Sequence, residues 1–399
     1  MKKRKILISS FDLAIGGVER SLIGLLKQID YQKYDVDLML FKHEGDFLPY
    51  LPSGPKLLPE IPAYTTFRKS IYQITKEGNY PIAISRTIAK YIGLLHGKIK
   101  KVDEPGYLAI QYGWEVSSRF LPKLNKEYDV AIGFLWPHHF IGEKVKARKK
   151  IGWIHTDYSN IFINEKLDSQ MWNKLDKIVA VSDECLNTFV NVFPLLKEKT
   201  TVIENILSPQ FIKEQANIGN STEITKREGK TVLLTVGRLS HAKGLDKAIR
   251  ACRILVNAGY DIEWYVVGYG PLEADLRELI KQLNLSDRFF LLGKKTNPYP
   301  YIKNCDIYVQ PSRYEGKAVT IREAQILGKP IVITNFPTAN SQATNGVDAL
   351  ITSQDISGLV DGIQSLINED TLRNRLISNV LSKDYGNENE IEKLYNLIG

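Results

Sequence analysis

The chain alternates short apolar runs with amphipathic stretches along most of its length. Short apolar runs are typical of buried strands, and the stretches between them carry apolar residues at helical spacing. We expect strands at residues 5–9, 35–41, 130–134, 150–154, 177–181, 231–236, 262–267, 288–292, 306–310 and 330–334. Strands that alternate with helices predict parallel sheets covered by helices.

The alternation restarts once. Residues 214–230 are polar and have no apolar period, and a fresh apolar run at 231–236 ends at Gly237. A length of 399 residues is enough for two ordinary domains. We therefore predict an α/β chain of two Rossmann-like, doubly wound parallel-sheet domains that face a cleft, residues 1–205 and 206–384. Ligands of such sheets bind beyond the carboxyl ends of the strands.

Composition indicates a globular protein of a reducing compartment. The three cysteines, at positions 185, 252 and 305, form neither a disulfide framework nor a metal spacing. The sequence has no apolar run long enough for a transmembrane helix. The basic start followed by a short apolar stretch is typical of a first strand rather than a signal peptide. We expect a cytoplasmic protein.

Positive charge is concentrated in the first half. Residues 1–205 hold 30 of the 53 Lys and Arg and 23 of the 45 Asp and Glu, so +7 of the net charge of +8 lies there. Residues 98–101 and 144–150 are the densest basic clusters. An ordinary solvated surface is one interpretation. The other is a face for anionic lipid or an acidic acceptor, which the amphipathic segment 82–101 favours. No nucleic-acid-binding module accompanies the charge, so nucleic acid is not expected.

Two glutamates flank a glycine turn after the strand 306–310. Glu315 precedes Gly316, and Glu323 lies near the start of a predicted helix. A carboxylate accepts hydrogen bonds from a vicinal diol, and a helix N-terminus binds phosphate. This pattern suits a sugar nucleotide. The alternative is that Glu315 is an ordinary acidic residue of a loop and that Glu323 merely complements the helix dipole.

Two cations share the loop after the strand 231–236. Arg238 can grip phosphate with its planar guanidinium, and Lys243 adds a compact charge. The alternative is a pair of solvated cations.

Two glycine-rich turns are weaker signals. Gly16 and Gly17 follow the first strand and open a helix, which suits close approach of an anion but also suits a purely structural turn. Gly268 and Gly270 start like a dinucleotide fingerprint, yet Glu273 stands where the third glycine belongs. We predict a structural turn with Pro271 as the first helical residue. An NAD-dependent oxidoreductase is therefore disfavoured.

Histidines follow two strands. His155 comes directly after the strand 150–154, with Asp157 two positions on, and we expect it at a functional site. His138 and His139 follow the strand 130–134. No further ligand stands at a suitable spacing, so a metal site is not expected.

These motifs, in this order, resemble the family-4 retaining glycosyltransferases of the GT-B fold, of the type that builds bacterial surface polysaccharides. The resemblance extends over roughly residues 5–335. The matching segments are 16–19, 154–157, 237–239 with 243–244, 268–271, 312–316 and 323–324. The acidic segment together with the cationic loop is the most specific part.

The resemblance implies a role for each matching position. Arg238 and Lys243 would bind the donor diphosphate, Glu323 the ribose and Glu315 the donor sugar. His155 would lie beside the reacting sugar, so that His155, Arg238, Lys243 and Glu315 form the catalytic set. The remaining donor contacts would come from the backbone of Gly16, Gly17, Gly316, Lys317, Ala318 and Val319 and from the turn at Lys294.

One position departs from the family. The family usually has an apolar residue and then a small residue or proline where this chain has Lys317 and Ala318. The departure affects what can be inferred about the donor sugar, and it makes Lys317 a candidate for a cation beside the phosphates or the acceptor.

The resemblance also implies the reaction and its setting. Residues 1–205 would face the acceptor, with residues 385–399 as a segment that crosses back onto them, and residues 206–384 would bind the nucleotide sugar. The donor would be a UDP-sugar and the acceptor a glycan or lipid-linked sugar at the inner face of a membrane, with neither metal nor other cofactor. A sugar-nucleotide epimerase of the same fold and a non-catalytic binding subunit are the alternatives.

Overall fold

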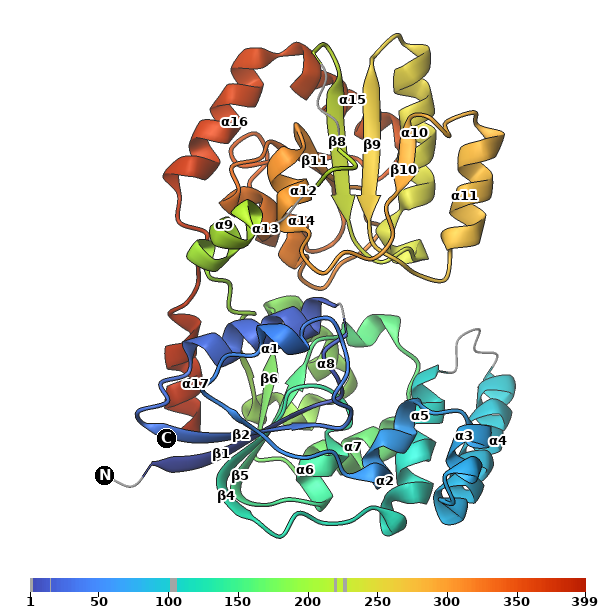
Figure 1. The fold of residues 1–399 in the computed structure, drawn as a ribbon, viewed down its shortest axis with the longest axis vertical. Coiled ribbons are helices and arrows are strands. Elements are labelled where there is room, and N and C mark those ends of the chain that lie inside the picture. The colour runs from blue at the N-terminus through green and yellow to red at the C-terminus, as the bar shows by residue number, and fades with distance from the viewer. Residues whose placement is uncertain (1–2, 15, 101–105, 219–220, 225–227) are drawn as a thin grey trace. The chain divides into compact units, whose positions relative to one another are not determined.

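The protein folds into two compact α/β units, seen in a computed structural model that describes residues 3–14, 16–100, 106–218, 221–224 and 228–399 (Figure 1). Unit 1 comprises Met1–Ile206 and Glu388–Gly399, and unit 2 comprises Leu207–Asn387. Each unit is built on one parallel sheet with helices around it, so the predicted fold class of two Rossmann-like domains is confirmed.

Unit 1 contains a seven-stranded parallel sheet in the order β3-β2-β1-β4-β5-β6-β7. Its strands are β1 (Arg4–Ser10), β2 (Tyr34–Leu40), β3 (Lys56–Leu57), β4 (Glu127–Gly133), β5 (Lys146–Ile154), β6 (Lys177–Ala180) and β7 (Thr200–Val202). The strand order reverses between β1 and β4, which places the topological switch point there. The strands are parallel neighbours because helical segments connect them on the sheet faces.

The helices of unit 1 come from both ends of the chain. They are α1 (Gly17–Gln28), α2 (Pro62–Thr65), α3 (Ile71–Lys76), α4 (Tyr80–Lys100), α5 (Gly106–Ser117), α6 (His139–Glu143), α7 (Glu165–Asn173), α8 (Asp183–Val192) and α17 (Glu390–Ile398). Side-chain caps start several of them; Ser182 Oγ, for example, accepts a hydrogen bond from the Cys185 amide at 3.2 Å in α8.

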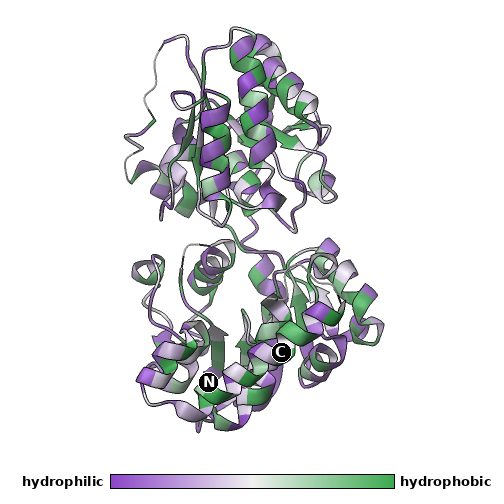
Figure 2. Ribbon diagram, turned by 90° about the vertical axis from the view of Figure 1, so that its right-hand side faces the viewer, coloured by the Kyte–Doolittle hydropathy of each residue, from purple (hydrophilic) through white to green (hydrophobic). Residues whose placement is uncertain are grey.

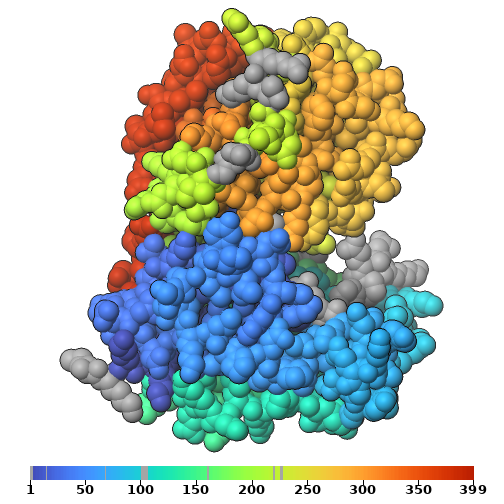
Figure 3. All heavy atoms as spheres, in the orientation of Figure 1, coloured from blue at the N-terminus to red at the C-terminus, as the bar shows by residue number. Residues whose placement is uncertain are grey.

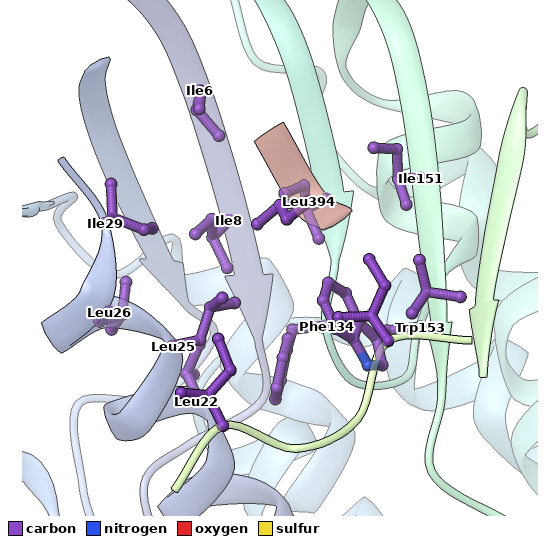
Figure 4. Close-up of a cluster of buried hydrophobic side chains, with 14 of the residues drawn as sticks. Ile6, Ile8, Leu22, Leu25, Leu26, Ile29, Phe134, Ile151, Trp153 and Leu394 are labelled. Atoms are coloured by element: carbon purple, nitrogen blue, oxygen red, sulfur yellow. The ribbon is translucent and has the colours of Figure 1, made fainter. Parts of the chain in front are cut away.

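The C-terminal helix α17 packs into the core of unit 1. Leu394 is 1% exposed and lies among Ile8 of β1, Leu22 of α1 and Trp153 of β5 (Figure 4). Hydrogen bonds add to this burial, since the Tyr395 hydroxyl accepts from the Asp30 amide at 2.8 Å. The segment therefore belongs to the same compact unit as residues 1–206.

Unit 2 contains a six-stranded parallel sheet in the order β10-β9-β8-β11-β12-β13. Its strands are β8 (Thr231–Val236), β9 (Ile262–Val267), β10 (Phe289–Leu291), β11 (Ile307–Gln310), β12 (Ile331–Thr334) and β13 (Leu350–Thr352). Its helices are α9 (Pro209–Asn217), α10 (Leu245–Asn257), α11 (Glu273–Gln282), α12 (Tyr299–Asn304), α13 (Val319–Ile326), α14 (Ala339–Gln342), α15 (Ile356–Asn368) and α16 (Asp370–Ser382). Its switch point lies between β8 and β11.

Helix α9 extends into the polar stretch 214–230 as far as Asn217, and it buries Ile212 and Ala216. One local prediction is wrong. Helix α11 starts at Glu273 rather than Pro271, because Pro271 and Leu272 form a turn that is bonded to Leu239 O at 3.1 Å. Across the described residues, no helix is long and apolar enough to cross a membrane.

Candidate functional site

The candidate site of unit 2 lies at the carboxyl ends of β8 and β11. These strands are neighbours at the switch point of the sheet, so the loops that leave them diverge to opposite sides. The β8 loop carries Arg238 and Lys243, and the β11 loop carries Glu315. The sheet topology thus brings together two motifs that are far apart in the sequence.

Lys243 and Glu315 contact each other directly. The ammonium Nζ lies 2.5 Å from Oε1 and 2.6 Å from Oε2 of the carboxylate. The side chains are only 21% and 8% exposed, so solvent screens the pair little. The residues predicted to bind phosphate and sugar are therefore adjacent in the structure.

A buried glutamine fixes the Glu315 carboxylate. Gln310, which is fully buried at the end of β11, donates through Nε2 to Glu315 Oε1 at 2.8 Å and to Ser312 Oγ at 2.9 Å. Ser312 donates in turn to Glu315 Oε1 at 2.6 Å. The Tyr308 hydroxyl donates to Gln310 Oε1 at 2.7 Å, which sets the orientation of the amide. Sequence analysis did not find this network, although Gln310 is a polar residue at the end of an apolar strand.

An ion pair ties the two loops together. Arg313 donates through Nη1 and Nη2 to the two oxygens of Asp246, each at 2.7 Å, and through Nη1 to His241 O at 2.8 Å. Burial by itself would raise the pKa of the Asp246 carboxyl, but the hydrogen bonds and charge of Arg313 outweigh burial, so the pKa is lowered. The backbone of the two loops is joined as well, because the Arg313 amide donates to Ala242 O at 2.7 Å. Sequence analysis missed this clamp.

Glycines allow these loops to pack closely. Gly244 is the N-cap of α10 and has a φ of +63°, and a side chain there would clash with Pro311 O of the β11 loop. Gly268 has a φ of +157°, and its side chain would meet Gly237 O at 1.8 Å. These contacts give the glycines a role in loop packing, as predicted for the turn at Gly268.

Arg238 is exposed at the same edge. Its side chain has neither a hydrogen bond nor an ion pair to any residue that the structure describes. The guanidinium is thus available to an anion beside the Lys243–Glu315 pair.

The segment from Gly316 to Val319 leads into α13. Lys317 is half-buried, and Ala318 is buried with its amide donating to Gln342 Oε1 at 2.8 Å. Val319 is the first residue of α13, whose N-terminus provides amide groups and a favourable dipole for an anion.

Two other predicted donor residues of unit 2 are Glu323 and Lys294. Glu323 is fully buried in α13 and accepts from the Tyr299 hydroxyl at 3.2 Å. Lys294 follows β10, and its ammonium lies 5.5 Å from the centroid of the Tyr269 ring. Both are part of the same unit as Lys243 and Glu315.

Unit 1 carries Gly16, Gly17 and His155. Gly16 is the N-cap of α1, and the space beside Gly17 is open. His155 is half-buried after β5 and donates through Nε2 to Phe134 O at 2.9 Å, which leaves Nδ1 as an acceptor. Burial lowers the pKa of His155 to about 3, with a further lowering from His138, so the ring is neutral at pH 7.

No cluster of three or more His, Cys, Asp or Glu side chains suited to a metal ion is found in the part of the chain that the structure describes. Positive groups of the candidate site of unit 2 include Lys243, Arg238 and Arg313.

Known proteins match both the sequence and the fold. Residues 219–382 match the family described as "Glycosyl transferases group 1". The N-acetylgalactosamine-N,N'-diacetylbacillosaminyl-diphospho-undecaprenol 4-alpha-N-acetylgalactosaminyltransferase of Campylobacter jejuni is 26% identical over 54% of this chain and 57% of its own length. The poly(ribitol-phosphate) alpha-N-acetylglucosaminyltransferase of Staphylococcus aureus is 24% identical over 63% of this chain and 51% of its own length. The chain thus spans little more than half of these two relatives.

Solved structures superpose on nearly the whole length of this chain. HepE from Anabaena, crystallised with UDP and glucose, superposes with a TM-score of 0.69 at 16% identity and covers 99% of both chains. TarM superposes with a TM-score of 0.66 at 15% identity. At such low identities, the structural similarity establishes the fold of this chain. The two-domain fold of these structures is that of GT-B glycosyltransferases. Residues 219–382 therefore match the group 1 glycosyl transferases, within a chain that has the GT-B fold.

Proposed function

We propose that the protein is a retaining glycosyltransferase that moves a hexose-type sugar from a nucleoside-diphosphate sugar to an acceptor hydroxyl. The observation that carries the proposal is the Lys243–Glu315 pair at the switch point of unit 2. A cation and a carboxylate in contact provide adjacent positions for a phosphate and a sugar hydroxyl. The family match over this unit supports the same assignment.

The chemical difficulty of the reaction is charge on the leaving group. The bond between the anomeric carbon and the diphosphate oxygen breaks, and the diphosphate gains negative charge. Lys243, Arg238 and the N-terminus of α13 would stabilise that charge. Because these groups supply positive potential, we propose that neither a metal ion nor another cofactor takes part.

The acceptor proton must go to a base as the new bond forms. A pKa of about 3 makes His155 a weak base at neutral pH. We therefore propose that the leaving diphosphate takes the proton while the acceptor oxygen bonds to the anomeric carbon from the same face. In this scheme His155 provides a neutral hydrogen-bond acceptor at Nδ1 to the reacting sugar or the acceptor.

We propose a UDP-sugar as the donor and a lipid-linked glycan of surface-polysaccharide synthesis as the acceptor. Structures of the same fold were crystallised with UDP, and the Campylobacter relative acts on a diphospho-undecaprenol acceptor by its name. Such an acceptor would place the enzyme at the cytoplasmic face of a membrane as a peripheral protein. Within the donor site, Gly316, Lys317, Ala318 and Val319 would contact phosphate or sugar and Glu323 the ribose.

UDP release from a panel of UDP-sugars tests the proposal. Lys243→Ala and Glu315→Gln should lower the rate by about 100- to 1,000-fold, which corresponds to roughly 3–4 kcal/mol of transition-state stabilisation. Lys281→Ala and Glu278→Gln are matched controls, because both residues are exposed on α11. A folded Lys243→Ala variant with the rate of the wild-type protein would overturn the assignment.

A further inference from the structure

Helix α4 of unit 1 is apolar on two opposite faces. Its inward face packs on α5 through small residues, and a side chain at Gly93 would lie only 3.3 Å from Ala109 Cα. Ile82 and Ala89 are buried on that side as well. The inward face is thus already covered by protein and explains only part of the apolar character of the helix.

The outward face of α4 carries large apolar side chains in contact with solvent. Ile84, Ile88, Tyr91, Leu95 and Ile99 follow one another at spacings of three or four residues, so they lie on one side of the helix. They are 46–77% exposed. Figure 1 shows α4 beside α3 on the side of unit 1 that Figure 2 turns toward the viewer, and the light-blue region that includes α3 and α4 lies at the surface in Figure 3. A row of this kind marks an interaction surface.

Charge indicates what covers this face. Between Gly78 and Val102 the sequence has five basic residues and no acidic residue. Arg86 bonds to Lys69 O at 2.9 Å, whereas Lys90 and Lys98 are exposed. A second copy of the chain would place α4 against another basic helix with no acid on it to pair. An anionic lipid surface instead offers both a layer for the apolar side chains and phosphate groups for the lysines.

We propose that α4 binds in the plane of an anionic lipid bilayer, with its outward apolar face below the headgroups and Lys90 and Lys98 among them. Tyr91 suits this position, because its ring is apolar and its hydroxyl is polar. The inference deepens the proposed function, because a lipid-linked acceptor is held in such a surface. The reason for the binding, namely access to that acceptor, rests on the proposed function. Binding itself requires no donor.

Co-sedimentation of the full-length protein with lipid vesicles tests the inference. Vesicles of phosphatidylcholine with 30% phosphatidylglycerol should bind the wild-type protein at least tenfold more strongly than phosphatidylcholine alone. Ile84→Gln/Leu95→Gln should lower binding to the anionic vesicles by at least about tenfold. Glutamine is a good helix former, and both sites are exposed, so the fold should persist. Lys90→Gln/Lys98→Gln should weaken binding by about fivefold for each lysine and reduce its salt dependence.

Matched controls replace exposed leucines elsewhere. Leu195→Gln and Leu381→Gln, at sites 97% and 64% exposed, should bind vesicles like the wild-type protein. Failure of the wild-type protein to bind anionic vesicles would overturn the inference, as would a folded Ile84→Gln/Leu95→Gln variant that binds normally. A wild-type dimer that this double variant converts to monomers, without vesicle binding, would assign the face to a second copy. UDP release measured in parallel tests the proposed function separately.

Discussion

The candidate edges of the two units differ in the state of their ionisable groups. In unit 2, Lys243 pairs with Glu315 and Arg313 pairs with Asp246, so charge is held close to the sheet edge. In unit 1, the histidines after β4 and β5 are held neutral by burial. The group 1 family match covers only residues 219–382, all within unit 2. Under the proposed function, the charged edge of unit 2 would bind the donor diphosphate and the neutral edge of unit 1 would lie on the acceptor side.

The largest expected effect is a loss of stability at low pH that affects unit 1 and not unit 2. Burial lowers the pKa of His138 to about 4 and of His139 and His155 to about 3. Since unfolded histidine binds a proton near pH 6.5, unit 1 should lose stability as the pH falls from about 6.5 toward 4. At pH 5.5 the loss should be between about 1 and 2 kcal/mol for each histidine, or about 4 kcal/mol in all. The raised pKa of Asp168 acts in the opposite direction, so this sum is an upper value.

Hydrogen exchange resolved along the chain checks this difference. Amides of β4 and β5 should lose protection between pH 7 and 5.5, after correction for the intrinsic rates, while those of β8 and β11 should change little. His241, the histidine of unit 2, is exposed and provides the internal comparison. Equal loss of protection in both units would contradict the proposed origin of the effect.

A smaller effect should follow from loosening α17. Leu394→Ala removes a side chain that is 1% exposed and should destabilise unit 1 by about 3 kcal/mol. Chemical denaturation followed by tryptophan fluorescence, to which unit 1 contributes four of the five tryptophans, measures the change together with hydrogen exchange in both units. Leu195→Ala, at a site 97% exposed, is the control and should change stability by less than about 0.5 kcal/mol. A change confined to unit 2 would refute the packing of α17 on unit 1.

The smallest effect concerns the orientation of Glu315. Gln310→Leu keeps the approximate size of the side chain but removes the donor to the Glu315 carboxylate. UDP release should slow by about tenfold, or roughly 1.4 kcal/mol, mainly in kcat and with little change in UDP affinity. Gln282→Leu on the surface of α11 is the matched control. If the two variants release UDP at the same rate, Gln310 has no positioning role.

Features of the fold that depend on a local sequence pattern could be predicted. Strands such as β8 and β9 were predicted with the bounds that the structure has, because each is a mostly apolar run of six residues. The short edge strands β3, β7 and β13 were not predicted, since two or three residues give no measurable period.

Contacts between distant residues could not be predicted from single motifs. Arg313 and Asp246 are 67 positions apart, and nothing in either segment indicates the partner. The role of Gln310 depends on the register of β11 beside β8, which is a property of the folded sheet. Conversely, the order of Arg238, Lys243 and Glu315 after their strands was enough to predict that they share one edge.

Calorimetric titration with UDP tests the central claim, that the charged edge of unit 2 is the donor site. The account predicts that the wild-type protein binds UDP and that Arg238→Ala and Lys243→Ala each weaken binding by at least about tenfold, because each removes a charge-assisted contact of roughly 1.5–3 kcal/mol. Arg277→Ala, at an exposed position of α11, should bind like the wild-type protein. Unchanged UDP affinity in folded Arg238→Ala and Lys243→Ala variants would contradict the claim.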